Sequence, residues 1–259
     1  MSTRKRLRLF FRVIAVVAVL IAAKAAIHEL GFEFVTLGAL LPTIVASAVF
    51  IIGFLLSGIL SDYKEAERMP AEIRMALEAI HDDVFYFAQK TPNVDFEGVR
   101  GTLLGIVAAL EDGLGTNGVD SDLSAAIAQI DKLSPAFAQL ELRGISQNLL
   151  VRLRGEQDVL RKCLFRIYHM QKMQFVPSVY VLVQTLVFAT LFLFLFLKTE
   201  RSFESALIFG FVSYMFVYAL HLVETLEQPF RKAEHSVDDV SIFLLRDFVE
   251  KIGRPKGET

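Results

Sequence analysis

The chain has 259 residues, of which 54% are hydrophobic and only 22% are charged, and its mean hydropathy is +0.48. A soluble domain of this length normally has a lower mean hydropathy, and here the excess lies in blocks, as in membrane proteins. The net charge of −2 and the pI near 6.2 exclude the broad basic field of a nucleic-acid-binding protein. Cys163 is the only cysteine, so no disulfide can form within the chain.

The first hydrophobic segment, residues 13–23, follows a basic start and is interrupted by Lys24. Two interpretations are open: a retained transmembrane helix, or a secretory signal cut at the small residues Ala23 and Ala25. Hydrophobicity resumes at Phe32 and demands a further span, so we favour the retained helix. Both interpretations place the start of the second span outside the cytoplasm.

Three later segments are uncharged and close to the ~20 apolar residues that are needed to cross a bilayer. They lie within residues 34–61, 175–197 and 205–223, and a short polar loop joins the last two into a hairpin. Pro42 falls near the first turn of its span, where proline costs least. The sequence therefore predicts four transmembrane helices.

Lysine and arginine set the predicted orientation. No lysine or arginine lies between Ala25 and Leu60, whereas basic residues precede the first span and flank the cytoplasmic ends of the others. The positive-inside rule then places both termini and the segment 61–174 in the cytoplasm. Lys198 and Arg201, in the outer hairpin loop, are a minor exception.

Residues 61–174 are numerous enough to fold as a domain. Apolar residues recur there at helical spacing, first at Ile73, Leu77, Ile80, Val84 and Phe87, and again in residues 96–114. We expect Pro70 to kink or restart the first helix. We also expect Ser121 or Asp122 to cap a short helix that ends near Pro135, and a long helix to run from about Ser146 to Met173.

The predicted fold class is therefore an all-α membrane protein, with four transmembrane helices and a helical cytoplasmic domain between the second and third. The expected boundaries are 1–60 for the first two transmembrane helices and 61–174 for the cytoplasmic domain. Residues 175–224 hold the last two transmembrane helices, and 225–259 form a cytoplasmic tail.

One wedge of the second span carries hydroxyl groups at both ends and phenyl rings between them. Its residues are Thr43, Ser47, Phe50, Phe54, Ser57 and Ser61. Such a face could line a pore with a hydrophobic constriction. Gly53, Ser57 and Ser61 also follow the small-xxx-small pattern of close helix packing, which is the alternative.

Lys24 shares a helix face with His28 and could attract anions near the outer mouth, since intramembrane charges are functional candidates. The alternatives are a side chain that reaches to the outer interface, or the signal cleavage site. Tyr214, Tyr218 and His221 form another polar stripe, followed by Glu224, for which interhelical hydrogen bonding is the favoured interpretation.

No pattern indicates an enzyme. The five histidines match no metal-ligand spacing, and His81, Asp82 and Asp83 point to different helix faces. No glycine-rich phosphate loop follows a strand, and no nucleophile has an evident base. We expect no catalytic residue, cofactor or metal.

Two segments resemble the bestrophin family. Residues 60–72, Leu60-Ser-Asp-Tyr-Lys-Glu-Ala-Glu-Arg-Met-Pro-Ala-Glu, resemble a signature of uncharacterised bestrophin-like membrane proteins, and Glu227-Gln-Pro-Phe resembles the acidic-x-Pro-Phe turn of bestrophins. The resemblance implies a pentameric anion channel whose second transmembrane helices form a hydrophobic neck, with Phe50 and Phe54 as the positions to compare. Bestrophins follow this turn with acidic residues that hold calcium. Arg231 and Lys232 stand there instead, which argues against calcium gating.

The leading hypothesis is an oligomeric anion channel with the second span lining the pore, in a lipid bilayer and without a nucleic-acid partner. The compact design and the lack of eukaryotic targeting signals favour a bacterial inner membrane. The alternative is a non-conducting scaffold or sensor whose cytoplasmic helices bind a protein partner.

Overall fold

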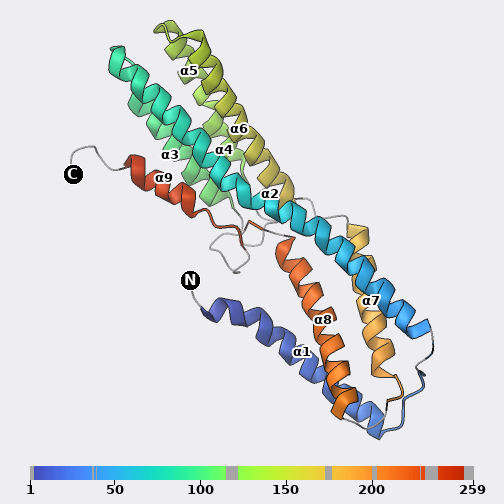
Figure 1. Ribbon diagram of the computed structural model, residues 1–259. Helices are drawn as coiled ribbons and strands as arrows, with labels where there is room; N and C mark the ends of the chain where they lie inside the picture. The colour runs from blue at the N-terminus through green and yellow to red at the C-terminus, as the bar shows by residue number, and fades with distance from the viewer. Residues whose placement is uncertain are drawn as a thin grey trace. The chain divides into compact units, whose positions relative to one another are not determined.

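A computed structural model describes residues 3–36, 38, 40–114, 122–172, 177–199, 203–227, 229–230 and 239–253. These residues form an all-α structure (Figure 1), in which the only β-type pairing is an isolated bridge between Val35 and Leu197. The chain divides into two compact units. Unit 1 comprises residues 1–63, 174–227 and 236–238, and unit 2 comprises residues 64–173, 228–235 and 239–259.

Unit 1 contains α1 (Thr3–Glu29), the first part of α2 (Leu40–Lys90), α7 (Pro177–Leu195) and α8 (Phe203–Leu226). Three of these helices are long and apolar enough to cross a membrane, and the apolar helix α7 is shorter. Helices are the expected form, because a backbone in hydrocarbon must satisfy its hydrogen bonds within the segment. Helix α1 continues without a break through Ala23 and Ala25.

The core of unit 1 joins one side of each helix. Helix α1 packs along α8, and α7 contacts both. The buried residues at the centre of this core include Val13, Val17, Ile52, Leu55, Val187 and Phe216. Only one side of α2 takes part in this core, through Ala48, Ile52, Leu55 and Ile59.

The loops that follow α1 and α7 are tied together. Gly31 takes φ +68° just past the end of α1, a conformation that glycine adopts at low cost. Val35 then donates its N–H to the Phe196 carbonyl at 3.0 Å and accepts one from Lys198 at 2.7 Å. These bonds hold the α1–α2 connection against the end of α7.

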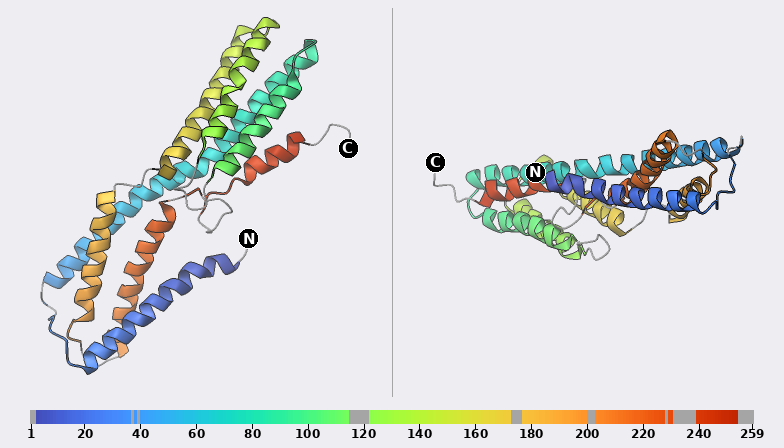
Figure 2. Two further views of the ribbon diagram at one scale, coloured as in Figure 1. Left: turned by 180° about the vertical axis from the view of Figure 1, so that it is seen from behind. Right: turned by 90° about the horizontal axis from the view of Figure 1, so that it is seen from below.

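Unit 2 is a bundle formed by the remainder of α2, α3 (Phe96–Gly113), α4 (Ser124–Asp131), α5 (Leu133–Leu142), α6 (Gln147–Lys172) and α9 (Phe243–Gly253). Figure 2 shows its longer helices lying side by side. The predicted stripe is confirmed for Ile73, Leu77, Ile80 and Val84, which are buried, while Phe87 is half-buried. Opposite them, α3 buries Leu103, Ile106 and Leu110, and α9 buries Phe248.

Pro70 and Pro135 both lie inside helices. Pro70 does not restart a helix, because α2 runs from Leu40 to Lys90 with the proline inside it, and a kink at Pro70 stays a prediction. Pro135 does not end a helix either. It lies in the first turn of α5, where the missing N–H of proline would have no helical partner in any case.

The N-cap of α4 is Leu123, not Ser121 or Asp122, and it makes no side-chain cap bond. Asp122 lies one residue earlier and its Oδ1 accepts the Ser124 N–H at 2.9 Å, while Ser121 lies outside the described residues. The predicted long helix from Ser146 to Met173 corresponds to α6. A further cap, Asp95 on the Gly98 N–H at 2.8 Å, begins α3.

Candidate functional site

The predicted pore face of α2 is exposed in the part of the chain that the structure describes. All six of its residues are exposed: Thr43, Ser47, Phe50, Phe54, Ser57 and Ser61. Phe50 is 75% exposed and Phe54 is 78% exposed, whereas Ile52 and Leu55 between them are buried in the core of unit 1. The helix therefore presents two different sides: an aliphatic one to α1, α7 and α8, and a hydroxyl-and-phenyl one away from them.

The small residues on this side do not serve packing within the described part of the chain. Gly53, Ser57 and Ser61 are exposed, and a Cβ on Gly53 would meet no atom within 4 Å. Ser47 uses its hydroxyl locally, donating to the Thr43 carbonyl at 2.8 Å. This side of α2 is thus exposed among the described residues.

Lys24 is buried near the C-terminal end of α1 and has several polar partners. Its ammonium lies 2.6 Å from Glu33 Oε1 and also donates to the Leu197 carbonyl. His28 Nδ1 lies 3.2 Å from the same Glu33 oxygen, and the Thr199 N–H donates to the other at 3.4 Å. The shared face of Lys24 and His28 is confirmed, but Glu33, on which both converge, was not predicted.

The charge state of Glu33 follows from these contacts. Burial by itself raises the pKa of this carboxyl group, but the hydrogen bonds from Lys24 and His28 and the charge of Lys24 outweigh burial. The pKa therefore lies below its ordinary value of 4.5, and Glu33 is a carboxylate at neutral pH. Glu33 neutralises Lys24 at this position.

The polar residues of α7 and α8 are only partly paired. Tyr180 on α7 donates its hydroxyl to Oε1 of Glu224 on α8 at 2.8 Å. Interhelical hydrogen bonding is the interpretation favoured for the polar stripe of α8, but the sequence does not indicate Tyr180 as the partner. The rings of Tyr214 and Tyr218 stack at 5.7 Å between centroids. His221 Nδ1 is buried and has no hydrogen-bond partner among the described residues.

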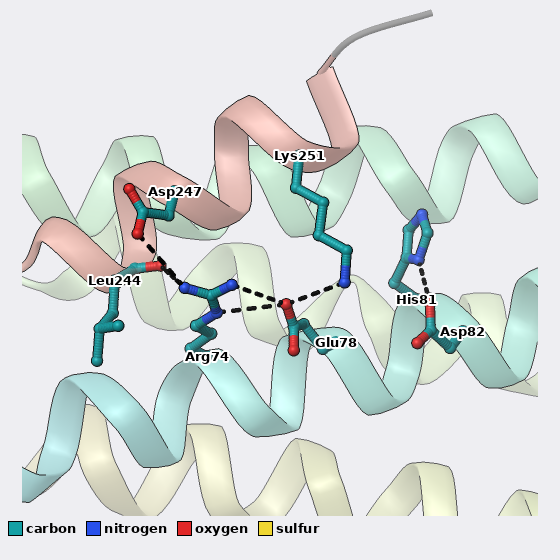
Figure 3. Close-up of polar contacts among 7 residues, drawn as sticks. All are labelled: Arg74, Glu78, His81, Asp82, Leu244, Asp247 and Lys251. Atoms are coloured by element: carbon teal, nitrogen blue, oxygen red, sulfur yellow. Dashed lines mark hydrogen bonds and ion pairs between the residues drawn. The ribbon is translucent and has the colours of Figure 1, made fainter. Parts of the chain in front are cut away.

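Charged side chains fasten α9 to α2 in unit 2 (Figure 3). Arg74 contacts Glu78 at 3.2 Å, Asp247 at 3.7 Å and the Leu244 carbonyl at 3.4 Å. Lys251 reaches the same Glu78 at 3.2 Å. On α3, Arg100 donates to the Ile252 carbonyl at 2.8 Å at the C-terminal end of α9, where a cation is favourable.

The histidine and acidic residues of this unit do not gather into a metal site among the described residues. His81 Nδ1 lies 2.8 Å from Asp82 Oδ1, while Asp83 pairs with Arg152 at 3.2 Å.

The turn that resembles a bestrophin motif is only partly described. Pro229 and Phe230 are buried, and Gln171 donates to the Phe230 carbonyl at 3.2 Å. Gln228 and residues 231–238, which include the cations that argue against calcium, lie outside the described residues.

No protein-family model matches the sequence, and no curated protein matches it either. Solved structures do match. Three structures of a bestrophin homologue from Klebsiella pneumoniae superpose with TM-scores of 0.71, 0.75 and 0.73, at 17%, 16% and 17% identity. They cover 95%, 95% and 96% of this chain, and each is itself covered to 100%. At these identities the likeness shows a shared fold, and this chain has the fold of bacterial bestrophin homologues.

Proposed function

We propose that this chain is the subunit of an oligomeric, bestrophin-like ion channel that conducts anions, with α2 lining the pore. The observation that carries the proposal is the exposed side of α2, with Phe50 and Phe54 turned away from their own subunit and hydroxyl groups beyond them. Large apolar rings on a free helix face are what a hydrophobic constriction requires. The resemblance of residues 60–72 and 227–230 to bestrophins supports this assignment, because it implies that the second transmembrane helices form the neck.

The same proposal places the chain in the membrane. α1, the first part of α2, α7 and α8 cross a bacterial inner membrane, and both termini are cytoplasmic. Residues 61–174 and 225–259 lie on the cytoplasmic side, between and after the two pairs of spans. A ring of subunits, five by the bestrophin resemblance, encloses the pore. The proposal assigns the chain no catalytic activity.

Lys24 has a smaller part in this proposal. Its attraction for anions stays a prediction, and Glu33 neutralises it at neutral pH. We therefore expect the attraction to become measurable when the Glu33 charge is removed. A Glu33→Gln variant should then conduct anions better relative to cations than the parent protein.

Flux through purified protein tests the main proposal. The protein is reconstituted into liposomes, and chloride efflux is compared with potassium efflux under matched gradients. Chloride flux that exceeds cation flux supports the proposal. Absence of flux across pH, voltage and ionic strength, or a monomer in mild detergent, contradicts it.

A second candidate is a membrane scaffold whose unit 2 binds a protein partner. The observation in its favour is a set of large apolar side chains exposed on unit 2, among them Leu142 at 81%, Val151 at 70% and Phe165 at 54%. Crosslinking in cells separates the two candidates. One stoichiometric partner that is lost in a Leu142→Ser, Val151→Ser variant, together with absent flux, favours the scaffold.

A further inference from the structure

The ion pair between Lys24 and Glu33 joins three stretches of unit 1 that are far apart in the chain. Lys24 lies on α1, and Glu33 lies in the connection between α1 and α2. The Lys24 ammonium also donates to the carbonyl of Leu197, just past the end of α7, and the Thr199 N–H donates to the second oxygen of Glu33 at 3.4 Å. The pair therefore ties α1, the α1–α2 connection and the residues after α7 to one another.

A buried ion pair holds its surroundings together only while both charges are present. The side chains of Lys24 and Glu33 are each 11% exposed. Taking a charge out of water costs free energy that a close opposite charge offsets, so the loss of one partner leaves the other uncompensated. The Glu33 carboxylate is also the common acceptor for Lys24, His28 and Thr199. Glu33 is therefore the residue on which the tie depends.

A short series of backbone hydrogen bonds leads from this tie into α2. Val35, two residues after Glu33, is held to the segment after α7 by the two hydrogen bonds described above. The Gly38 N–H then donates to the Thr36 carbonyl at 2.8 Å, and the Leu41 N–H donates to the Gly38 carbonyl at 3.2 Å. Leu41 lies in the first turn of α2 and is buried. The start of α2 is therefore linked to the tie by the connection itself.

Packing decides which part of α2 depends on this connection. The body of the helix is fixed by four residues that belong to the core of unit 1: Ala48, Ile52, Leu55 and Ile59. Residues 42–47 are all described, and none of their side chains is buried. The first two turns of α2 are therefore held mainly by the connection, whereas the helix from Ala48 onward is held by the core.

We propose that Glu33 is a positioning residue of the channel: its pair with Lys24 places the start of α2 at the mouth of the pore. The inference rests on the proposed function, because it takes α2 as the helix that lines the pore. Thr43 and Ser47 are the pore-face residues in the part of α2 that the connection holds. The two phenyl rings lie beyond it, so the constriction should keep its place when the tie is broken.

A disulfide measures the tie without any ion flux. Val35 and Leu197 form a β-bridge, and bridged residues lie about 4.8 Å apart, within the ~4.4–6.8 Å between Cα atoms that a disulfide spans. In a Cys163→Ala background, the pair Val35→Cys and Leu197→Cys should therefore crosslink under a mild oxidant. Addition of Glu33→Gln should slow this crosslinking roughly fivefold, because the two segments then separate more often.

The matched control is Lys198→Gln, which changes an exposed side chain of the same segment and should leave the crosslinking rate unchanged. Loss of free thiols, followed by mass spectrometry, measures the rates. A rate in Glu33→Gln equal to that of the control would show that Glu33 does not hold the two segments together, and would overturn the proposal.

Ion flux in liposomes tests the consequence for the pore. The parent protein and Glu33→Gln carry the same cysteine pair, and flux is normalised to the folded oligomer in the elution peak. With the cysteines reduced, Glu33→Gln should lower the total of chloride and potassium flux roughly threefold, because a displaced mouth misaligns the path of the ions. The charge of Lys24 acts on the ratio of the two fluxes instead.

Oxidation of the cysteine pair supplies the rescue. A disulfide between positions 35 and 197 replaces the tie but not the charge of Glu33, so it should restore the total flux of Glu33→Gln to within about twofold of the parent protein. Renewed reduction should lower the flux again. Flux that stays low after complete oxidation would overturn the positioning role, because Glu33 would then act through its charge.

The two readouts separate this inference from the proposed function. If the parent protein conducts no ion, the proposed function fails and the positioning role fails with it, whatever the crosslinking rate. If the parent protein conducts, and Glu33→Gln crosslinks slowly but conducts as the parent does, the positioning role alone is overturned.

Discussion

At the scale of single residues, the partners of a charge depend on distant parts of the chain. Lys24 is an obvious candidate in the sequence, because it is the charge within a hydrophobic run. Its two partners are Glu33, in the following loop, and the carbonyl of Leu197, which lies 173 residues away. A backbone carbonyl carries no signal in the sequence, so this half of the site could not have been predicted.

Removal of Glu33 should destabilise unit 1. Glu33→Ala leaves a buried ammonium with one acceptor, at a cost of about 1–3 kcal/mol. The folded-state pKa of Glu33 is lowered, so its stabilisation is present above the ordinary value of 4.5 and is lost as the pH falls below it. The variant should therefore lose its monodisperse elution peak at a lower temperature than the parent protein at pH 7, and the difference should shrink at acidic pH.

Lys198→Ala is the matched control, because Lys198 belongs to the same loop pair but its side chain is exposed. A midpoint for Glu33→Ala no lower than that of this control would contradict the assigned role.

Cys163 should be chemically inert in the folded protein. Burial and the nearby Glu72, which accepts its S–H at 3.6 Å, raise the pKa of the thiol to about 12. The reactive form is the thiolate, so maleimide labelling at pH 7 should be roughly ten- to a hundredfold slower than in the denatured chain. Stopped labelling followed by mass spectrometry measures the rates. Glu72→Gln should speed labelling, and rapid labelling of the folded parent protein would show that the thiol is accessible.

At the scale of elements, α2 shows what a helical pattern does and does not specify. The residues of its exposed side lie on one face of the helix. The sequence identifies this face because residues three and four positions apart lie on the same side of any α-helix. Which side of the helix is buried depends on the three other helices of unit 1, which pack on Ala48, Ile52 and Leu55. The continuity of α2 through Pro70 also depends on its surroundings, since proline by itself disfavours a helix interior.

Truncation of Phe54 tests the exposed side of α2. If Phe54 forms a hydrophobic constriction, Phe54→Ala widens it and raises the basal chloride flux in liposomes several-fold, because a wider apolar ring stays hydrated. The control is Val49→Ala, on the same helix and 42% exposed, but off the wedge. Similar flux through both variants and the parent protein would remove Phe54 from the conduction path.

At the scale of the whole molecule, the distribution of lysine and arginine and the length of the apolar segments predict how the chain lies in a bilayer. The coordinates alone do not contain this information, because they include no membrane. Lysine and arginine set the predicted orientation, and the apolar helices of unit 1 provide the length. The shared fold with bacterial bestrophin homologues adds the arrangement of the helices.

The orientation can be measured with single cysteines. In a Cys163→Ala background, Thr36→Cys probes the connection between α1 and α2, and Leu142→Cys probes unit 2 at an 81%-exposed position. A membrane-impermeant maleimide applied to intact cells should label Thr36→Cys alone, and permeabilised cells should label both. Labelling of Leu142→Cys in intact cells would reverse the proposed topology.

The sequence by itself determined the helical class, the apolar segments, the polar wedge of α2 and the stripe that unit 2 buries. All of these follow from hydropathy and from the 3.6-residue period, which are properties of neighbouring residues. Only the tertiary structure decided that the wedge is exposed among the described residues, that Glu33 neutralises Lys24, and that His221 Nδ1 is buried without a hydrogen-bond partner among those residues. These facts depend on which helices meet, and that depends on the free energy of packing the whole chain rather than on any local pattern.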